Sequence, residues 1–390
     1  MEILIYYVTN TTKTIYILKI LQVKYIFIIF LIFVFTEVRS QDPNYSQFTH
    51  NPIYYNPAYT GISSGMTMRF NYRKQWTNLP GDFRTYNFNI DLAARTASGS
   101  GGLGLMVDKH TAGSGYYERT RIGLPVSVRV PLYENMLVQM GVMTSFVQKS
   151  LNWDNLIFVD QLDPRFGNVN PSDFVSPLKN KVTYPDFDIG LAFRLVESTW
   201  SGKQIIATAG VAVHHVFTPN ESFFEFESPI ARKLVVTGDF ILQNEDYERV
   251  ITSYNRGDKG GFKFNPGFIF QKQSEFKSFT LGMNVYKSNI YAGFWYRNET
   301  FDLLKSNALI LMLGINAKIN EESRLKILYS YDVLLNESLY RAAGGTHELT
   351  LIFTLDSFSA LTGGGRGGSF GRNMMGSRSN RYSALECSPF

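Results

Sequence analysis

The feature that most constrains the fold is a two-residue alternation of apolar and polar side chains in the segment 324–353. In its first half, R-L-K-I-L-Y-S-Y-D, Leu328 is the one apolar residue on the otherwise polar face. In its second half the alternation continues to Phe353, and only Ile352 interrupts it. Successive side chains of a strand point to opposite faces. The segment therefore predicts a β-hairpin with one apolar face and an aromatic residue at a strand end, a pattern typical of membrane β-barrels.

The same alternation recurs along the chain from residue 66 onward. The further predicted strands cover 66–72, 86–92, 102–110, 121–132, 136–148, 187–195, 205–216, 232–242, 262–271, 276–286, 290–298 and 309–319. With the opening hairpin they make about 14, and most are roughly 9 to 13 residues long, which suits tilted membrane strands. Short turns alternate with longer connections, and the stretch 243–261 has room for one more short strand. We expect an all-β fold, a transmembrane antiparallel β-barrel over 65–355 whose last strand pairs with its first.

Two soluble all-β folds compete with the barrel. Neither a β-sandwich nor a β-propeller requires apolar and aromatic residues on the outward face of every strand, and aromatic residues make up 15% of this chain. A propeller also predicts a repeat of about 40 residues, which the sequence lacks. The outward faces are therefore expected to contact outer-membrane lipids.

The N-terminus has the layout of a secretory signal peptide over 1–40. An apolar run over 25–35 follows three lysines, and Val38 and Ser40 provide small residues before a cleavage site at Gln41. A retained helical anchor is the alternative, but the apolar run is too short to span a bilayer. We expect export, cleavage and residence in a bacterial outer membrane.

The segments at either end of the predicted barrel differ from it in composition. Residues 41–64 are rich in proline and tyrosine, which predicts an extended segment that is neither helix nor strand. Unpaired backbone is not tolerated in hydrocarbon, so we expect this segment to pack in the lumen or under its mouth. Residues 356–390 are rich in Gly, Ser and Arg, which predicts a flexible periplasmic tail. Four tail arginines account for most of the net charge of +5, so the body has no basic face for nucleic acid.

Four motifs resemble parts of catalytic or metal sites. His347-Glu348 begins like a zinc motif, but Leu351 stands where the second histidine belongs and strand geometry separates the pair. The adjacent His214-His215 lies at a strand end, where the two rings should diverge and serve an interfacial role. Asp186 and Asp188 share a face, as acid–base pairs do, yet a charge network beside Arg194 fits better. The single cysteine, Cys387, excludes an intrachain disulfide. We therefore expect no catalytic residues, cofactor or metal.

The alternation instead predicts that charged residues of both signs share the inward face of the strands. The predicted lumen network contains Arg69, Arg73, Asp91, Asp186, Asp188, Arg194, Arg297, Asp332 and Glu348, with Asn89 beside it. These groups can pair with one another and with the N-terminal segment, and a barrel of 14 strands is wide enough to hold a plug. We expect a closed, filled barrel that acts as a docking platform.

Several spaced motifs resemble those of one family. They are Q-D-P-N-Y-S-Q-F and N-P-I-Y-Y-N-P-A-Y-T-G after the signal peptide, P-D-F-D-I-G-L at 185–191, V-H-H-V-F-T-P-N at 213–220, F-W-Y-R at 294–297, and Y-S-Y-D and G-G-T-H-E-L within 329–349. Over Gln41 to about Phe353 the chain resembles the PorP/SprF family of type IX secretion system membrane proteins. The resemblance implies a non-enzymatic outer-membrane barrel of Bacteroidetes-type bacteria that works with other secretion or gliding components.

The resemblance also implies a function in export and surface anchoring of a large cargo protein, in some members a gliding adhesin. We expect the cargo C-terminal domain to bind the loops 151–183 and 218–230, and above all the aromatic residues Phe223, Phe224 and Phe226. The alternative is a transport channel for hydrophobic or small polar nutrients, which an open lumen would favour.

Overall fold

The structure of the chain is a computed structural model. It describes residues 42–63, 65–79, 81, 83–96, 99–113, 117–133, 135–174, 179–198, 203–244, 262–299, 307–320 and 323–355. The predicted signal peptide, the predicted tail and most of the stretch 243–261 lie outside these residues.

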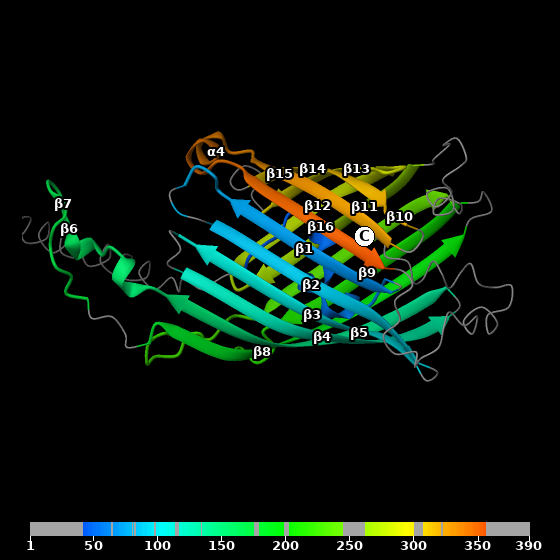
Figure 1. Ribbon diagram of the computed structural model, residues 1–390, viewed down its shortest axis with the longest axis horizontal. Helices are drawn as coiled ribbons and strands as arrows, with labels where there is room; N and C mark the ends of the chain where they lie inside the picture. Colours follow the sequence, from blue (N-terminus) through cyan, green and yellow to red (C-terminus); the bar gives the residue numbers. More distant parts are fainter. Residues whose placement is uncertain are drawn as a thin grey trace, which may run out of the picture. The chain divides into compact units, whose positions relative to one another are not determined.

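Within the described residues, 14 strands close into one antiparallel barrel (Figure 1). They are β1 (Met66–Gln75), β2 (Phe83–Thr96), β3 (Gly99–Ala112), β4 (Tyr117–Tyr133), β5 (Met136–Leu151), β8 (Lys181–Ser198), β9 (Lys203–His214), β10 (Lys233–Asn244), β11 (Phe262–Gln273), β12 (Phe276–Lys287), β13 (Ile290–Asn298), β14 (Asn307–Lys318), β15 (Ser323–Leu334) and β16 (Thr346–Leu355). Neighbours in sequence pair with each other, and β16 closes the barrel on β1 with Met68 opposite Phe353. The predicted barrel, its strand number and its closing pair are confirmed.

The two ends of the barrel differ in their connections. One end, the long-loop end, carries the connections 152–180, 215–232 and 335–345. The first contains η3 (Trp153–Asn155), η4 (Val159–Gln161) and a small sheet of β6 (Leu162–Asp163) and β7 (Gly167–Asn168), and the last contains α4 (Glu337–Ala343). The other end, the short-turn end, holds mostly tight turns such as the one between β12 and β13, together with the start of β1 and the end of β16. Residues 245–261 connect β10 to β11 at this end.

Over the part of the chain that the structure describes, no helix has the length and apolar character that crossing a membrane would need.

The wall separates apolar and polar side chains by parity, and β4 shows this most clearly. Its outward residues are Ile122, Leu124, Val126, Val128, Val130 and Leu132, each between 47% and 59% exposed. On the inward face of the same strand Arg121, Ser127 and Arg129 are buried. An apolar outer surface around a polar interior is the arrangement of an outer-membrane barrel.

The N-terminal segment lies inside the barrel (blue in Figure 1), and its conformation differs from the prediction. It is compact rather than extended, because it folds into η1 (Phe48–His50), α2 (Pro52–Tyr55) and η2 (Pro57–Tyr59). Pro52 and Pro57 occupy the first positions of their helical turns, where a missing backbone N–H costs little. The side chain of Asn56 caps η2 by accepting a hydrogen bond from the Ala58 N–H at 2.8 Å. The prolines therefore start helical turns here, and the prediction of neither helix nor strand was wrong. We call residues 42–63 the plug.

The plug fits closely because several wall residues that face it are glycines. A Cβ on Gly141 would lie 2.3 Å from the Ala58 nitrogen, and one on Gly190 would lie 1.9 Å from Asn56 Oδ1. Real Cβ atoms essentially never come this close to another heavy atom. The absence of a side chain at these positions therefore allows η2 to rest directly on the inner surface of β5 and β8.

On the opposite side, apolar residues pack against the plug. Phe48 meets Trp295 edge to face at 4.9 Å, and both belong to a buried cluster that includes Leu328 and Ile352. These two residues are the interruptions in the alternation of the closing hairpin. They point into the lumen, where the plug replaces water as their neighbour.

Candidate functional site

The candidate site is the interface between the plug and the inner wall, together with the loops above it. One group of wall residues at β1, β13, β15 and β16 binds the first part of the plug. Glu348 accepts hydrogen bonds from the backbone N–H groups of Ser46 (2.7 Å) and Gln47 (3.0 Å). Ser46 Oγ donates to Asp332 at 2.5 Å, and Arg297 donates to Ser46 Oγ at 3.0 Å and to Asp332 at 3.1 Å. Hydrogen bonds that a carboxylate accepts from backbone N–H groups are stronger than neutral ones, so these contacts hold the first part of the plug to the wall.

A second group holds the end of the plug that precedes β1. Asp91 pairs with Arg69 and accepts a hydrogen bond from the Gly61 N–H at 2.8 Å. The Thr60 carbonyl accepts hydrogen bonds from Ser127 and Gln139, each at 2.7 Å. The plug backbone here forms no strand hydrogen bonds, and buried N–H and C=O groups need hydrogen-bond partners. The wall side chains provide these partners.

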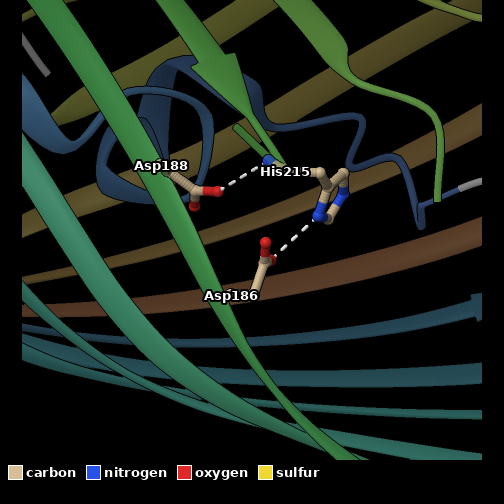
Figure 2. A group of neighbouring side chains, drawn as sticks. All are labelled: Asp186, Asp188 and His215. Atoms are coloured by element: carbon tan, nitrogen blue, oxygen red, sulfur yellow. Dashed lines mark hydrogen bonds and ion pairs between the residues drawn. The ribbon is translucent and has the colours of Figure 1, made fainter. Parts of the chain in front are cut away.

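A third group lies near the long-loop end, where Asp42 enters the lumen. Asp42 pairs with Arg119 at 2.5 Å and with His215 Nε2 at 2.8 Å. The other ring nitrogen of His215 lies 2.8 Å from Asp186 (Figure 2), and Arg121 pairs with Asp186 at 3.3 Å and also with Asp188. Charges of both signs alternate through the group.

The charge states of Asp42 and His215 follow from these neighbours. Burial alone would lower the pKa of His215, but Asp42 and Asp186 outweigh it and raise the pKa to about 9. Burial alone would raise the pKa of Asp42, but Arg119 and His215 hold it well below its usual range. Both groups are therefore charged at neutral pH, and both His215 nitrogens donate.

Asp186, Asp188 and His215 also lie within reach of one another as metal ligands, with one atom of each inside 4.8 Å (Figure 2). The chemistry of the set fits ion pairs better. Arg121 already contacts both carboxylates, and a doubly donating His215 offers no lone pair to a cation. A divalent ion would have to displace a buried guanidinium and remove a proton from the ring.

The nine predicted network residues all lie on the inward face, and each is at most 5% exposed. The structure divides them into separate groups rather than one network. Arg73, Arg297, Asp332 and Glu348 form the first group, Arg69 and Asp91 the second, and Asp186 and Asp188 the third. Arg194 is fully buried on β8, three inward positions beyond Asp188 toward the short-turn end. His347 pairs with Tyr329 at 2.6 Å on the wall, apart from the buried Glu348.

Asp42, Arg119 and Arg121 were not among the predicted site residues, and His215 was predicted in a different role. Arg119 and Arg121 share the parity of Arg129 along β4, so the alternation itself was a sufficient signal for the two arginines. His215 was assigned an interfacial role, with its ring diverging from His214, and this was wrong. The backbone of His215 has a φ of 56°, which breaks the strand alternation, so both rings are buried against lumen carboxylates.

Above the lumen, the two longest loops meet through aromatic side chains. Trp153 contacts Phe223 and Phe224 with ring centroids 5.9 Å and 5.7 Å apart, and Phe224 stacks on Phe226 at 5.1 Å. Trp153 also contacts Phe174, which meets Phe158 at 4.5 Å. We call these six residues the aromatic loop cluster. Phe224 and Phe226 remain 41% and 66% exposed.

Residues 37–353 match the model of the family described as Type IX secretion system membrane protein PorP/SprF. No curated protein sequence matches the chain. Among solved structures, the chain is similar to the CymD monoaromatic hydrocarbon channel, with 10% identity over 79% of this chain and 93% of that one and a TM-score of 0.45. A Pseudomonas aeruginosa FadL homologue has 11% identity over 81% and 95%, with a TM-score of 0.40. The β-domain of the Bordetella autotransporter BrkA has 10% identity over 75% and 99%, with a TM-score of 0.35. At such identities and scores these likenesses carry no argument about what the chain transports or binds.

Proposed function

Because the chain belongs to the PorP/SprF family, and so is an outer-membrane component of a type IX secretion system, we propose that it is a plugged docking platform for exported cargo. The aromatic loop cluster binds the C-terminal domain of a large cargo protein and anchors it at the cell surface. The observation that carries this proposal is the combination of exposed Phe224 and Phe226 with a lumen that is filled below them.

The filled lumen supports a platform more than a conduit. Wall carboxylates and amides bind plug backbone near both ends of the barrel, at Ser46 and Gln47 and again at Thr60 and Gly61. Between these points η2 rests on glycines of the wall. A transport channel for nutrients would need this plug to leave or to open a path beside the wall.

The loops supply the surface that a partner needs. In outer-membrane barrels the longer loops are extracellular and the short turns are periplasmic, which supports an extracellular position for the aromatic loop cluster. Exposed aromatic side chains that are gathered on ordered loops favour partner binding, because such residues dominate binding free energies. The outward strand faces contact outer-membrane lipids. Other secretion or gliding components complete the assembly, and the cargo is in some cases a gliding adhesin. The lumen carboxylates have no catalytic role in this proposal.

The test is a binding measurement between the barrel in lipid nanodiscs and the C-terminal domain of a type IX cargo encoded in the same genome. The double variant Phe224→Ala, Phe226→Ala should weaken binding at least about tenfold, because two aromatic anchors are lost. The matched control is Phe166→Ala, which removes a 72% exposed aromatic residue of the loop 152–180 outside the aromatic loop cluster. Unchanged binding by the double variant, or equal losses in both variants, would contradict the proposal.

A further inference from the structure

The plug runs through the lumen between the short-turn end and the long-loop end. Its last residues lie beside the start of β1, where Gly61 contacts Asp91 near the end of β2. Its first described residue, Asp42, contacts Arg119 near the start of β4 and His215 just beyond the end of β9, both at the long-loop end. In chain order the plug therefore runs from the long-loop end to the short-turn end, where the chain enters the wall as β1.

At the long-loop end Asp42 reaches both ends of the connection 215–232. Its carboxylate accepts from His215, the first residue of that connection. Its backbone N–H donates to Gln273 Oε1 at 3.2 Å, and Gln273 Nε2 donates to the Ala231 carbonyl at 3.3 Å. One plug residue thus holds one end of the loop directly and the other through a single side chain.

Between these ends the loop is stiffened by its own hydrogen bonds. The Glu221 N–H donates to the Ser228 carbonyl at 3.1 Å, and the Ile230 N–H donates to the Pro219 carbonyl at 3.0 Å. Phe223, Phe224 and Phe226 lie inside this closed section. A section that is braced internally moves as a unit, so the position of its two ends determines where the aromatic side chains point.

We propose that Asp42 is a positioning residue for the partner-binding loop, and that the plug thereby controls how Phe224 and Phe226 are presented. This inference rests on the proposed function for the meaning of the loop, but the contacts themselves do not depend on a partner. A carboxylate is the appropriate group, because it neutralises Arg119 and His215 together while its backbone N–H serves Gln273. The loop has two further anchors, the Lys149–Glu221 pair and the packing of Ile230 on Val147.

The test is hydrogen–deuterium exchange of the mature protein in lipid nanodiscs, without any partner. Asp42→Asn should speed exchange in 215–232 at least tenfold and leave the loop 335–345 of the same molecule unchanged. The matched control is Tyr59→Phe, which removes the plug hydrogen bond to Thr237 (2.8 Å), remote from the loop. It should leave 215–232 as in the wild type.

Unchanged exchange in 215–232, or an equal increase in 335–345 or in the Tyr59→Phe variant, would overturn the inference. Gln273→Ala provides a second route if Asp42→Asn does not fold, because it frees only the far end of the loop and should produce a smaller increase confined to 215–232. No increase in that variant would also count against the inference. Since no partner is present, a failure here is distinct from a failure of cargo binding by the Phe224→Ala, Phe226→Ala variant.

Discussion

Replacing Gly141 by alanine should displace the plug, although alanine is the smallest possible addition. The new Cβ would lie 2.3 Å from the Ala58 nitrogen and 2.4 Å from the Pro57 carbonyl carbon. An ordinary contact is about 3.5 Å, so the plug backbone must move by roughly 1 Å. Gly123 is the matched control on the neighbouring strand, because a Cβ there meets the flexible Met143 side chain, with Sδ at 2.9 Å.

The cost follows from what the displaced backbone is bonded to. Overpacking of a filled interior costs about 1–3 kcal/mol. The Thr60 carbonyl nearby accepts two hydrogen bonds of 2.7 Å from Gln139 and Ser127, and weakening them adds about 1 kcal/mol. We expect Gly141→Ala to lower the free energy of unfolding by about 2–4 kcal/mol and Gly123→Ala to change it little.

Denaturant unfolding in detergent micelles measures the difference, with tryptophan fluorescence as the signal because Trp295 contacts Phe48 of the plug. Amide exchange over 52–60 reports separately whether the plug has moved. If both alanine variants unfold at the same denaturant concentration and both protect 52–60 like the wild type, the close fit between plug and glycine wall is refuted.

Three further predictions concern the plug contacts. Glu348→Gln removes a buried carboxylate that binds Ser46, Gln47 and Arg73, and should lower the free energy of unfolding by roughly 3 kcal/mol. The control is Glu337→Gln in the exposed ion pair on α4, which should change the free energy of unfolding little. Equal effects of the two variants would argue against a buried network. The pKa of His215 is raised from 6.5 to about 9, so its stabilisation, on the order of 3 kcal/mol, is complete below pH 6.5 and is lost as the pH rises through about 9. The protection factors of amides in 215–232, each calculated against the intrinsic exchange rate at that pH, should therefore fall over that window. Protection factors that do not change with pH would contradict the pairing of His215 with its charged neighbours Asp42, Asp186, Asp188, Arg119, Arg121 and Lys233. A short epitope inserted before Asp42 should bind antibody on intact cells, whereas one in the β12–β13 turn should need permeabilised cells, and the reverse result would invert the assigned orientation.

The barrel was predictable because each strand must meet lipid on one face and the lumen on the other. That requirement imposes an alternation of apolar and polar side chains on every strand, and residues Ile122 to Leu132 show it on β4. The closing of β16 on β1 followed from the even strand number. Inward parity likewise located the buried charges, including Asp91 and Glu348.

The pairing of those charges was not predictable, because it depends on distance in space. Asp42 and His215 are 173 residues apart, and only the path of the plug brings them together. The helical turns of the plug are too short to show a period, so its prolines pointed to an extended chain. The alternation did not predict the orientation of His215, because its left-handed backbone conformation turns its ring to the face opposite to the one that a regular strand would give.

The most direct test of a plugged platform is the conductance of the mature protein in a planar bilayer. A plugged barrel should give no large, steady conductance from the intact chain and a large one after deletion of residues 42–61, since a 14-stranded barrel is wide enough to pass ions once it is empty. A large, steady conductance from the intact protein, unchanged by the deletion, would contradict a plugged lumen and favour a transport channel.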